Sequence, residues 1–177
     1  KRLPLTAGVH NTRDDKKGRL YIVNGAATNL AFKDRWSRFD PMVNIAYDLG
    51  EHAMVYAKYS TGLKAGGANS RSTNYSAFGP EEVTAYELGF KSQFWDNRAR
   101  LNLAVFDSTI AHKQMDFSLP FDPNSGETRT TMVTTNALSD GKSRGAELEF
   151  NVMPVDNLTL GLNYACLLYT SPSPRDS

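Results

Sequence analysis

Apolar and polar side chains alternate with a period of two over seven segments of this chain, and no segment shows the 3.6-residue period of an amphipathic helix. The segments are Leu5–Val9, Val43–Leu49, Val55–Leu63, Tyr86–Phe94, Leu101–Val105, Ala146–Val152 and Leu158–Tyr164. Successive side chains of a strand point to opposite faces, so each segment predicts a strand with one apolar and one polar face. We therefore expect an all-β fold of about seven strands.

The connections between these segments are of two kinds. Short turns lie at residues 50–52, 95–98 and 154–157, and long polar stretches lie at 15–37, 65–82 and 113–136. Short turns at one end and long loops at the other are typical of outer-membrane barrels, whereas a soluble β-sandwich mixes loop lengths at both ends. The pattern predicts a sequential antiparallel up-and-down meander that forms an open part of a transmembrane β-barrel.

Composition excludes several other classes of protein. The chain has 177 residues and a formal charge of +1, from 20 basic and 19 acidic residues without a block of one sign, so nucleic acid is not an expected partner. No apolar run approaches the roughly 18–20 residues of a membrane-spanning helix. Alternating strands average to a hydrophilic composition, so a strand-built membrane protein stays compatible with these figures.

Aromatic residues stand near the ends of the predicted strands. Trp36 and Phe39 lie at one rim, and Tyr47, Phe94 and Trp95 lie at the other. Aromatic girdles occupy these positions in transmembrane barrels because each ring sits between hydrocarbon and water. The alternative is that they are ordinary core aromatics of a soluble sheet.

Several segments together resemble the C-terminal half of TonB-dependent outer-membrane receptors. These segments, which run in order over residues 3–165, are Leu5–Val9, Phe39–Tyr47, Val55–Gly67, Gly79–Lys91, Leu101–Phe106 and Gly141–Glu149. The resemblance implies a 22-stranded barrel closed by a plug, in the outer membrane of a Gram-negative bacterium. It also implies outer-membrane lipid as the surroundings and the TonB protein as a partner, reached through an N-terminal box that this chain does not contain.

The function implied by the resemblance is energy-coupled uptake of a scarce ligand. A ferric siderophore is the first expectation, and cobalamin, haem and oligosaccharides remain open. The alternatives are a passive outer-membrane porin or a barrel enzyme and, outside the membrane, a soluble carbohydrate-binding β-sandwich. A plug-sized domain preceded by a TonB box upstream of this chain would distinguish the receptor from the porin.

The residues offer no expected catalytic, metal or cofactor site. His10, His52 and His112 have no histidine or cysteine at i+2 or i+4, and no nucleophile elbow is present. Glu147 and Glu149 share one face of a strand at i, i+2 spacing, which a catalytic pair could use. We expect them instead to face a wet lumen and to form ion pairs there.

The long loops are the expected place of ligand binding, because binding residues concentrate on loops that a rigid scaffold holds. Arginine can pair with an anionic chelate, and tyrosine or phenylalanine can stack on flat groups. The candidate ligand-binding residues are Arg71, Tyr75, Phe78, Phe117, Phe121 and Arg129. The alternative is that these residues only close the vestibule.

The two ends lead us to expect a fragment. The chain begins at Lys1 without an initiator methionine or signal segment, and more strands are expected after Tyr164. From Cys166, the only cysteine, the sequence CLLYTSPSPRD matches the translation of a sequencing-library adaptor. We therefore predict a partial receptor barrel domain over residues 1–165 and a non-native tail over 166–177; a natural Ser/Pro-rich tail is the alternative.

Overall fold

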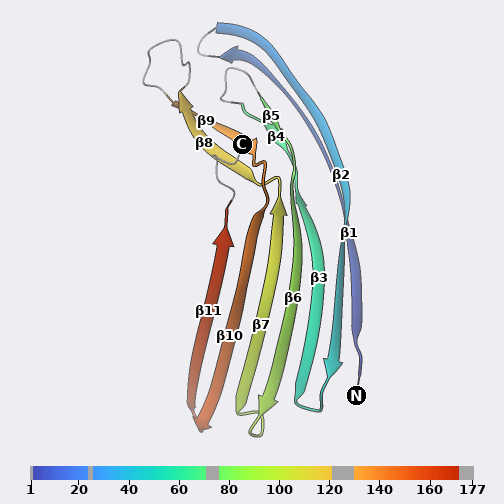
Figure 1. Ribbon diagram of the computed structural model, residues 1–177, viewed down its shortest axis with the longest axis vertical. Helices are drawn as coiled ribbons and strands as arrows, with labels where there is room; N and C mark the ends of the chain where they lie inside the picture. The colour runs from blue at the N-terminus through green and yellow to red at the C-terminus, as the bar shows by residue number, and fades with distance from the viewer. Residues whose placement is uncertain (1, 24–25, 71–75, 121–129, 172–177) are drawn as a thin grey trace.

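The computed structural model describes residues 2–23, 26–70, 76–120 and 130–171. Within these ranges the chain forms strands, and no helix is long and apolar enough to cross a membrane. Seven strands form one curved, open sheet that has no second layer (Figure 1). They are β1 (Leu5–Val23), β2 (Ala26–Asp48), β3 (Ala53–Lys64), β6 (Glu81–Phe94), β7 (Ala99–Ala111), β10 (Gly141–Val155) and β11 (Leu158–Thr170).

Every pair of neighbours in this sheet is antiparallel, in the order β1-β2-β3-β6-β7-β10-β11. The predicted seven-strand meander is confirmed, with Leu5–Val9 in one edge strand and Leu158–Tyr164 in the other. Two short antiparallel hairpins stand at one end of the sheet. One joins β4 (Gly67–Ala68) to β5 (Ala77–Phe78), and the other joins β8 (Gln114–Pro120) to β9 (Thr130–Asn136).

The opposite end of the sheet, called here the tight-turn end, carries the short connections. In the β6–β7 turn Trp95, Asp96 and Asn97 all have left-handed backbone angles, with φ of 55°, 49° and 64°, and the Arg98 N–H donates to the Trp95 carbonyl. Left-handed angles are uncommon for residues other than glycine. Three of them in succession reverse the chain tightly and fix the register of β6 against β7.

The long polar stretch 15–37 is not the loop that its composition indicates. β1 and β2 pair without interruption from Leu5–Ile45 to Leu20–Leu30, and two further pairs, Ile22–Ala27 and Val23–Ala26, follow a register shift. The β1–β2 hairpin thus rises well beyond the rest of the sheet (Figure 1). Both of its faces carry polar residues there, so the alternation that marks the other strands is absent. Stretches 65–82 and 113–136 likewise contain the β4–β5 and β8–β9 hairpins.

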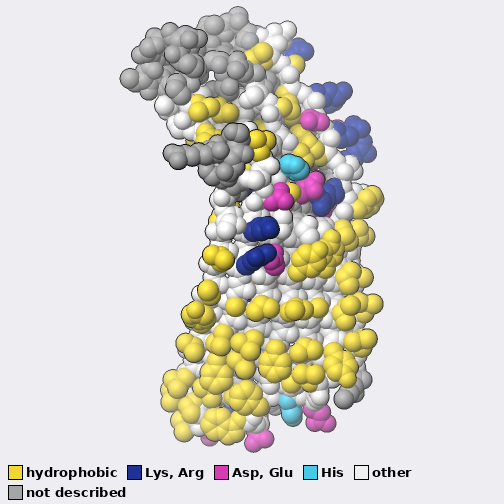
Figure 2. All heavy atoms as spheres, viewed as in Figure 1, with side chains coloured by type: hydrophobic (Ala, Val, Ile, Leu, Met, Phe, Trp, Pro, Cys, Tyr) yellow, Lys and Arg dark blue, Asp and Glu magenta, His cyan; other side chains and the backbone are white. Residues whose placement is uncertain are grey.

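The strand register gathers the apolar side chains on one face of the sheet. Leu103 of β7 pairs with Phe90 on one side and with Leu148 on the other, and the rows above and below it repeat this composition. Figure 2 shows the result, a band of hydrophobic side chains across the strands. Leu103, Val105 and Leu88 are 38%, 51% and 59% exposed, so the band has no protein partner in the described part of the chain. An apolar face of this extent calls for hydrocarbon around it.

Aromatic residues do mark the two edges of the band, although not all of those predicted. Tyr47, Phe94 and Trp95 are exposed at the tight-turn end, as expected for a girdle. Phe39 is exposed at the other rim, but Trp36 is an odd number of residues away in the same strand and faces the opposite side. The prediction that both belong to one girdle is therefore wrong. Tyr59 and Tyr86, with ring centroids 5.2 Å apart, occupy that rim on β3 and β6.

The structure shows no break at the predicted tail boundary. β11 continues from Leu158 through Thr170, and Cys166–Thr170 pair with Lys142–Ala146 of β10. An edge strand accepts any β-prone extension, because its outer backbone groups are unpaired. The non-native origin of residues 166–177 stays a prediction.

Candidate functional site

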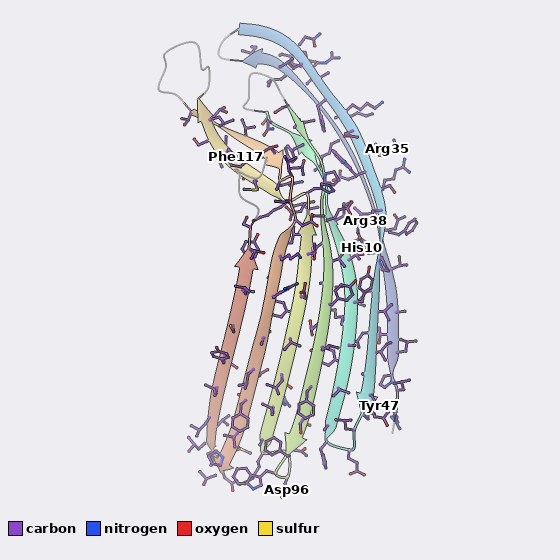
Figure 3. All side chains as sticks on the ribbon, viewed as in Figure 1. His10, Arg35, Arg38, Tyr47, Asp96 and Phe117 are labelled. Atoms are coloured by element: carbon purple, nitrogen blue, oxygen red, sulfur yellow. The ribbon has the colours of Figure 1, made fainter. Side chains whose placement is uncertain are left out.

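Two of the predicted ligand-binding residues are described, and both lie in hairpins beyond the band. Phe78 is the last residue of β5, and Phe117 is in the middle of β8, where Figure 3 labels it. Arg71, Tyr75, Phe121 and Arg129 lie outside the described residues. The hairpins and the extended β1–β2 arm together are called the hairpin end.

Phe78 serves the β4–β5 hairpin itself. Its half-buried ring lies on the backbone of Gly67, the residue paired with it, and a Cβ at position 67 would come within 2.8 Å of the ring. Phe117 is also half-buried and pairs with Val133 of β9. The structure therefore places the Phe78 ring against the backbone of its own hairpin and Phe117 opposite Val133 in the neighbouring strand, and contact of either ring with a ligand stays a prediction.

Asn69, next to β4, joins the two short hairpins. Its Nδ2 donates to the Thr134 carbonyl (2.9 Å) and to the Ser76 carbonyl (3.1 Å), and its Oδ1 accepts the Thr134 N–H (2.7 Å). The side chain is 6% exposed. An amide that completes a strand-like pair of bonds with a backbone 65 residues away fixes the position of one hairpin relative to the other.

Asn136 and Gln114 make a second connection, at the base of the same hairpins. The Gly79 N–H donates to Asn136 Oδ1 (2.5 Å), and Asn136 Nδ2 donates to the Gly79 carbonyl (3.1 Å). Gln114 Nε2 donates to the carbonyls of Ala65 (3.1 Å) and Gly79 (3.0 Å). These amides satisfy backbone groups that the short hairpin leaves without ladder partners.

The β1–β2 arm leans on this assembly. Lys16 Nζ donates to the Gly66 carbonyl (2.9 Å), and the Trp36 ring lies so close that a Cβ on Gly66 would come within 2.7 Å of it. Nearer the sheet, the Nε of Arg38, labelled in Figure 3, lies 3.0 Å from Asp40 and its Nη1 lies 2.5 Å from Glu82. Asp40 is 6% exposed, and it also accepts a bond from Thr61 (3.1 Å). The three hairpins thus form one hydrogen-bonded unit.

The polar face of the sheet is opposite the apolar band and carries ionisable side chains at intervals. The Tyr56 hydroxyl donates to Glu87 (2.6 Å), and the Lys91 ammonium lies 5.5 Å from the centre of the Tyr56 ring. The register places Glu147 and Glu149 on this face, and Glu149 accepts bonds from Asn102 (2.9 Å) and Asn151 (2.8 Å). Glu149 is therefore held by amides of its own wall.

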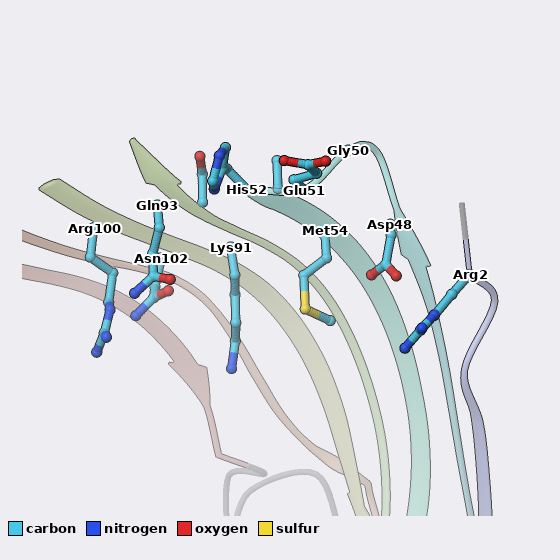
Figure 4. Close-up of a pocket in the computed structure, with 12 residues that line it drawn as sticks. Arg2, Asp48, Gly50, Glu51, His52, Met54, Lys91, Gln93, Arg100 and Asn102 are labelled. Carbon is cyan, nitrogen blue, oxygen red and sulfur yellow. The ribbon is translucent and has the colours of Figure 1, made fainter. Parts of the chain in front are cut away.

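A hollow of about 750 Å³ lies on the polar face near the tight-turn end. Figure 4 shows Lys91, Arg100 and Asn102 projecting into it from adjacent strands, with Asp48 and Arg2 across from them. Cations and carboxylates are mixed there. No group of three or more His, Cys, Asp or Glu side chains able to hold a metal occurs in the described part of the chain.

Sequence reasoning missed four of the residues that build the hairpin end: Gln114, Asn136, Lys16 and Arg38. In their longest contacts the partners lie between 44 and 57 residues away in sequence, and a side chain carries no local sign of such a partner. The one available signal was Gly66–Gly67, since two adjacent glycines often mark a close approach of backbone to another group.

Known proteins resemble this chain in sequence and in fold. A family model described as TonB dependent receptor-like, beta-barrel, matches residues 1–176. The ferripyoverdine receptor of Pseudomonas aeruginosa is 33% identical over 70 residues, which are 40% of this chain and 9% of that protein. Two solved structures share the fold. The ferric yersiniabactin uptake receptor of Yersinia pestis has a TM-score of 0.74 at 18% identity, over 95% of this chain and 24% of its own. A copper transporter has a TM-score of 0.70 at 14% identity, over 96% and 27%.

The chain thus spans about a tenth to a quarter of the length of these relatives. The structures fix the fold alone, since their identities are low, whereas the family model covers nearly the whole sequence. This chain belongs to the TonB-dependent receptors, the β-barrel receptors of the Gram-negative outer membrane, and forms part of the barrel wall.

Proposed function

We propose that the protein to which this chain belongs takes up a ferric siderophore through the outer membrane, and that its hairpin end is part of the extracellular ligand-recognition surface. One observation carries the proposal: three hairpins at one end of a lipid-facing wall are tied into one unit by side chains that do not contribute to the wall itself. A wall alone needs only short turns, and the other end of the sheet has them.

The sequence likeness to a ferripyoverdine receptor favours an iron chelate as the ligand, and the likeness to a copper transporter leaves other cargo possible. The proposed role is transport, without catalysis. The plug and the TonB protein would supply, respectively, the gate and the energy, and outer-membrane lipid would surround the apolar band. Preorganised hairpins favour tight capture, because a ligand then meets a surface that has already lost its conformational freedom.

The test removes the β4–β5 hairpin from the intact receptor. Lys64 pairs directly with Glu81, so residues 66–80 can be replaced by a two-residue turn without disturbing the β3–β6 ladder. Asn136 and Gln114 then lose their partners on Gly79, and the β8–β9 hairpin loses its tie to β4–β5. Binding of ferric siderophores should fall roughly five- to thirtyfold, as expected when contacts worth about 1–2 kcal/mol disappear.

The matched control changes the other end of β3. Glu51→Ala with His52→Ala alters the β2–β3 turn, and we expect unchanged ligand binding and uptake. Heat-modifiable gel mobility measures the amount of folded barrel in both variants. If the barrel without the β4–β5 hairpin binds every tested siderophore as tightly as the parent, the proposal is wrong, and the ligand is recognised by other parts of the receptor.

A further inference from the structure

We propose that the outward face of the β1–β2 arm docks against the phosphate groups of the lipopolysaccharide that surrounds the receptor. This inference concerns the outside of the barrel and does not depend on which ligand is transported. It starts from an unequal distribution of charge between the two faces of one hairpin.

The continuous register of β1 and β2 puts the odd-numbered residues of the arm on one face. That face carries five cations and a single carboxylate, Asp15. The cations are Arg13, Lys17, Arg19, Lys33 and Arg35. All five are exposed, and Figure 2 shows basic side chains along the upper right edge of the molecule. The even-numbered face has mixed charge and packs on the β4–β5 hairpin through Lys16 and Trp36.

The single carboxylate does not neutralise this face. Asp15 forms ion pairs with both Arg35 (2.5 Å) and Arg13 (3.6 Å). Lys17 and Lys33 are directly opposite each other in the ladder, and neither has a carboxylate within 4 Å among the residues described. Like charges opposite each other destabilise a sheet, so this pair is a cost to the isolated arm that an anion between the two ammonium groups would remove.

The height of the basic face matches the surface of the outer leaflet. Phe39, exposed at the rim of the apolar band, pairs with Asn11, and Arg13 follows two residues later. At about 3.3 Å per residue, the cations from Arg13 to Arg19 cover roughly 20 Å directly above the hydrocarbon. The ion pair of Asp107 in β7 and Arg144 in β10 also points outward and lies beside Tyr86. Charged side chains therefore begin at the same rim on this part of the sheet.

This position determines the chemistry of the partner. The outer leaflet of the Gram-negative outer membrane consists of lipopolysaccharide, whose lipid anchor and inner sugar core carry phosphate groups just above the acyl chains. Lysine and arginine bind phosphate by charge-assisted hydrogen bonds, and an anionic lipid surface attracts each nearby cation. A transported ligand would pass on the opposite face, so it is not the expected occupant.

The experiment titrates the intact receptor, purified free of lipopolysaccharide in neutral detergent, with fluorescent lipopolysaccharide. The Lys17→Gln, Lys33→Gln double variant loses no ion pair, so its fold should be intact. We expect its affinity to fall on the order of tenfold. The control, Lys58→Gln with Lys64→Gln, removes the same charge from the polar face of β3 and should change affinity less than about twofold.

Two further titrations identify the chemical group that binds. Dephosphorylated lipopolysaccharide should bind the parent receptor about as weakly as the double variant binds the native glycolipid, and millimolar inorganic phosphate should not displace the native glycolipid. Equal losses in the double variant and the control, or none in the double variant, would overturn the proposal. Displacement of the glycolipid by inorganic phosphate would also overturn the proposal, because the face would then be a site for small anions in general. If the double variant misfolds by gel mobility, Lys17→Gln alone replaces it.

Discussion

The band and the hairpin end of this chain are held together by different interactions. In the band, each strand contributes outward apolar side chains that repeat from row to row, and their partner is outside the chain. At the hairpin end, three amide side chains and Lys16 reach backbone groups more than 30 residues away, each at a position that its own distant partner determines. The first region is therefore specified by a pattern and the second by individual contacts.

The largest expected effect breaks the pattern in the band. Leu103→Arg places a charge on the outward face between Phe90 and Leu148, and it should lower the free energy of unfolding of the intact receptor by roughly 2–4 kcal/mol if position 103 lies near the midplane. Denaturant titration of receptor folded into lipid vesicles measures this loss.

The opposite face of β10 provides the matched control. Glu149→Gln keeps the shape of the side chain and its place beside Asn102 and should cost less than about 1 kcal/mol. Equal losses for the two variants would mean that the two faces are assigned wrongly.

A smaller and more local effect should follow from breaking one contact at the hairpin end. Asn69→Ala leaves the Thr134 N–H without its acceptor and removes the bonds to Ser76. The cost should be about 1–2 kcal/mol, confined to the β4–β5 and β8–β9 hairpins. Faster hydrogen exchange in those hairpins with unchanged exchange in β6 and β7 would show it. Asn44→Ala, on the polar face of β2, is the control and should leave the hairpins as they are; an equal change there would remove the special role of Asn69.

The smallest expected effect is electrostatic. The hydrogen bond from Arg35 holds the pKa of Asp15, which lies in the arm beyond the band, below its usual value, and Arg13 and Lys17 add to the shift. A carboxyl with a lowered folded-state pKa stabilises the fold above its unfolded pKa of about 3.9, and this contribution is lost as the pH falls through the folded-state value. Hydrogen exchange of the arm, corrected for its intrinsic pH dependence, should therefore rise below about pH 4.

The Asp15→Asn variant should show no such rise in hydrogen exchange. In the parent, high salt should make the rise smaller, because the Asp15–Arg35 ion pair is exposed to solvent. If opening of the arm in the parent does not change with pH, the backbone ladder alone accounts for the stability of the arm, and this prediction is wrong.

The same contrast explains what could be predicted from sequence. All seven strands of the sheet were visible because hydrocarbon on one side and water on the other impose alternation, as in Leu101–Val105. Composition alone predicts a loop over residues 15–37, because polar residues occupy both faces of β1 and β2 there and the strand pairing continues the register of the band.

At the candidate site, Phe78 and Phe117 fall within the hairpin end, where a ligand-binding role was predicted, but the contacts that organise it could not be foreseen. Asn69 and Thr134 are 65 residues apart, and nothing in the identity of a loop asparagine selects one distant backbone group over another. Trp36 lies near Phe39 along the chain, which favours one girdle, but the odd separation in sequence between the two positions puts their side chains on opposite faces of β2.

The most direct test of the contrast between the two regions is the accessibility of spin labels on the intact receptor in lipid. After Cys166→Ser, single cysteines at 100–105 in β7 and at 13–18 in β1 carry the label. Labels at 101, 103 and 105 should be accessible to oxygen dissolved in lipid, and labels at 100, 102 and 104 should be shielded from it. Labels at 13–18 should show no such accessibility at either parity, because the arm lies above the hydrocarbon. Absence of alternation in β7, or alternating contact of the arm with the hydrocarbon, would contradict the division of this chain into a hydrocarbon-facing wall and a hairpin end outside the hydrocarbon.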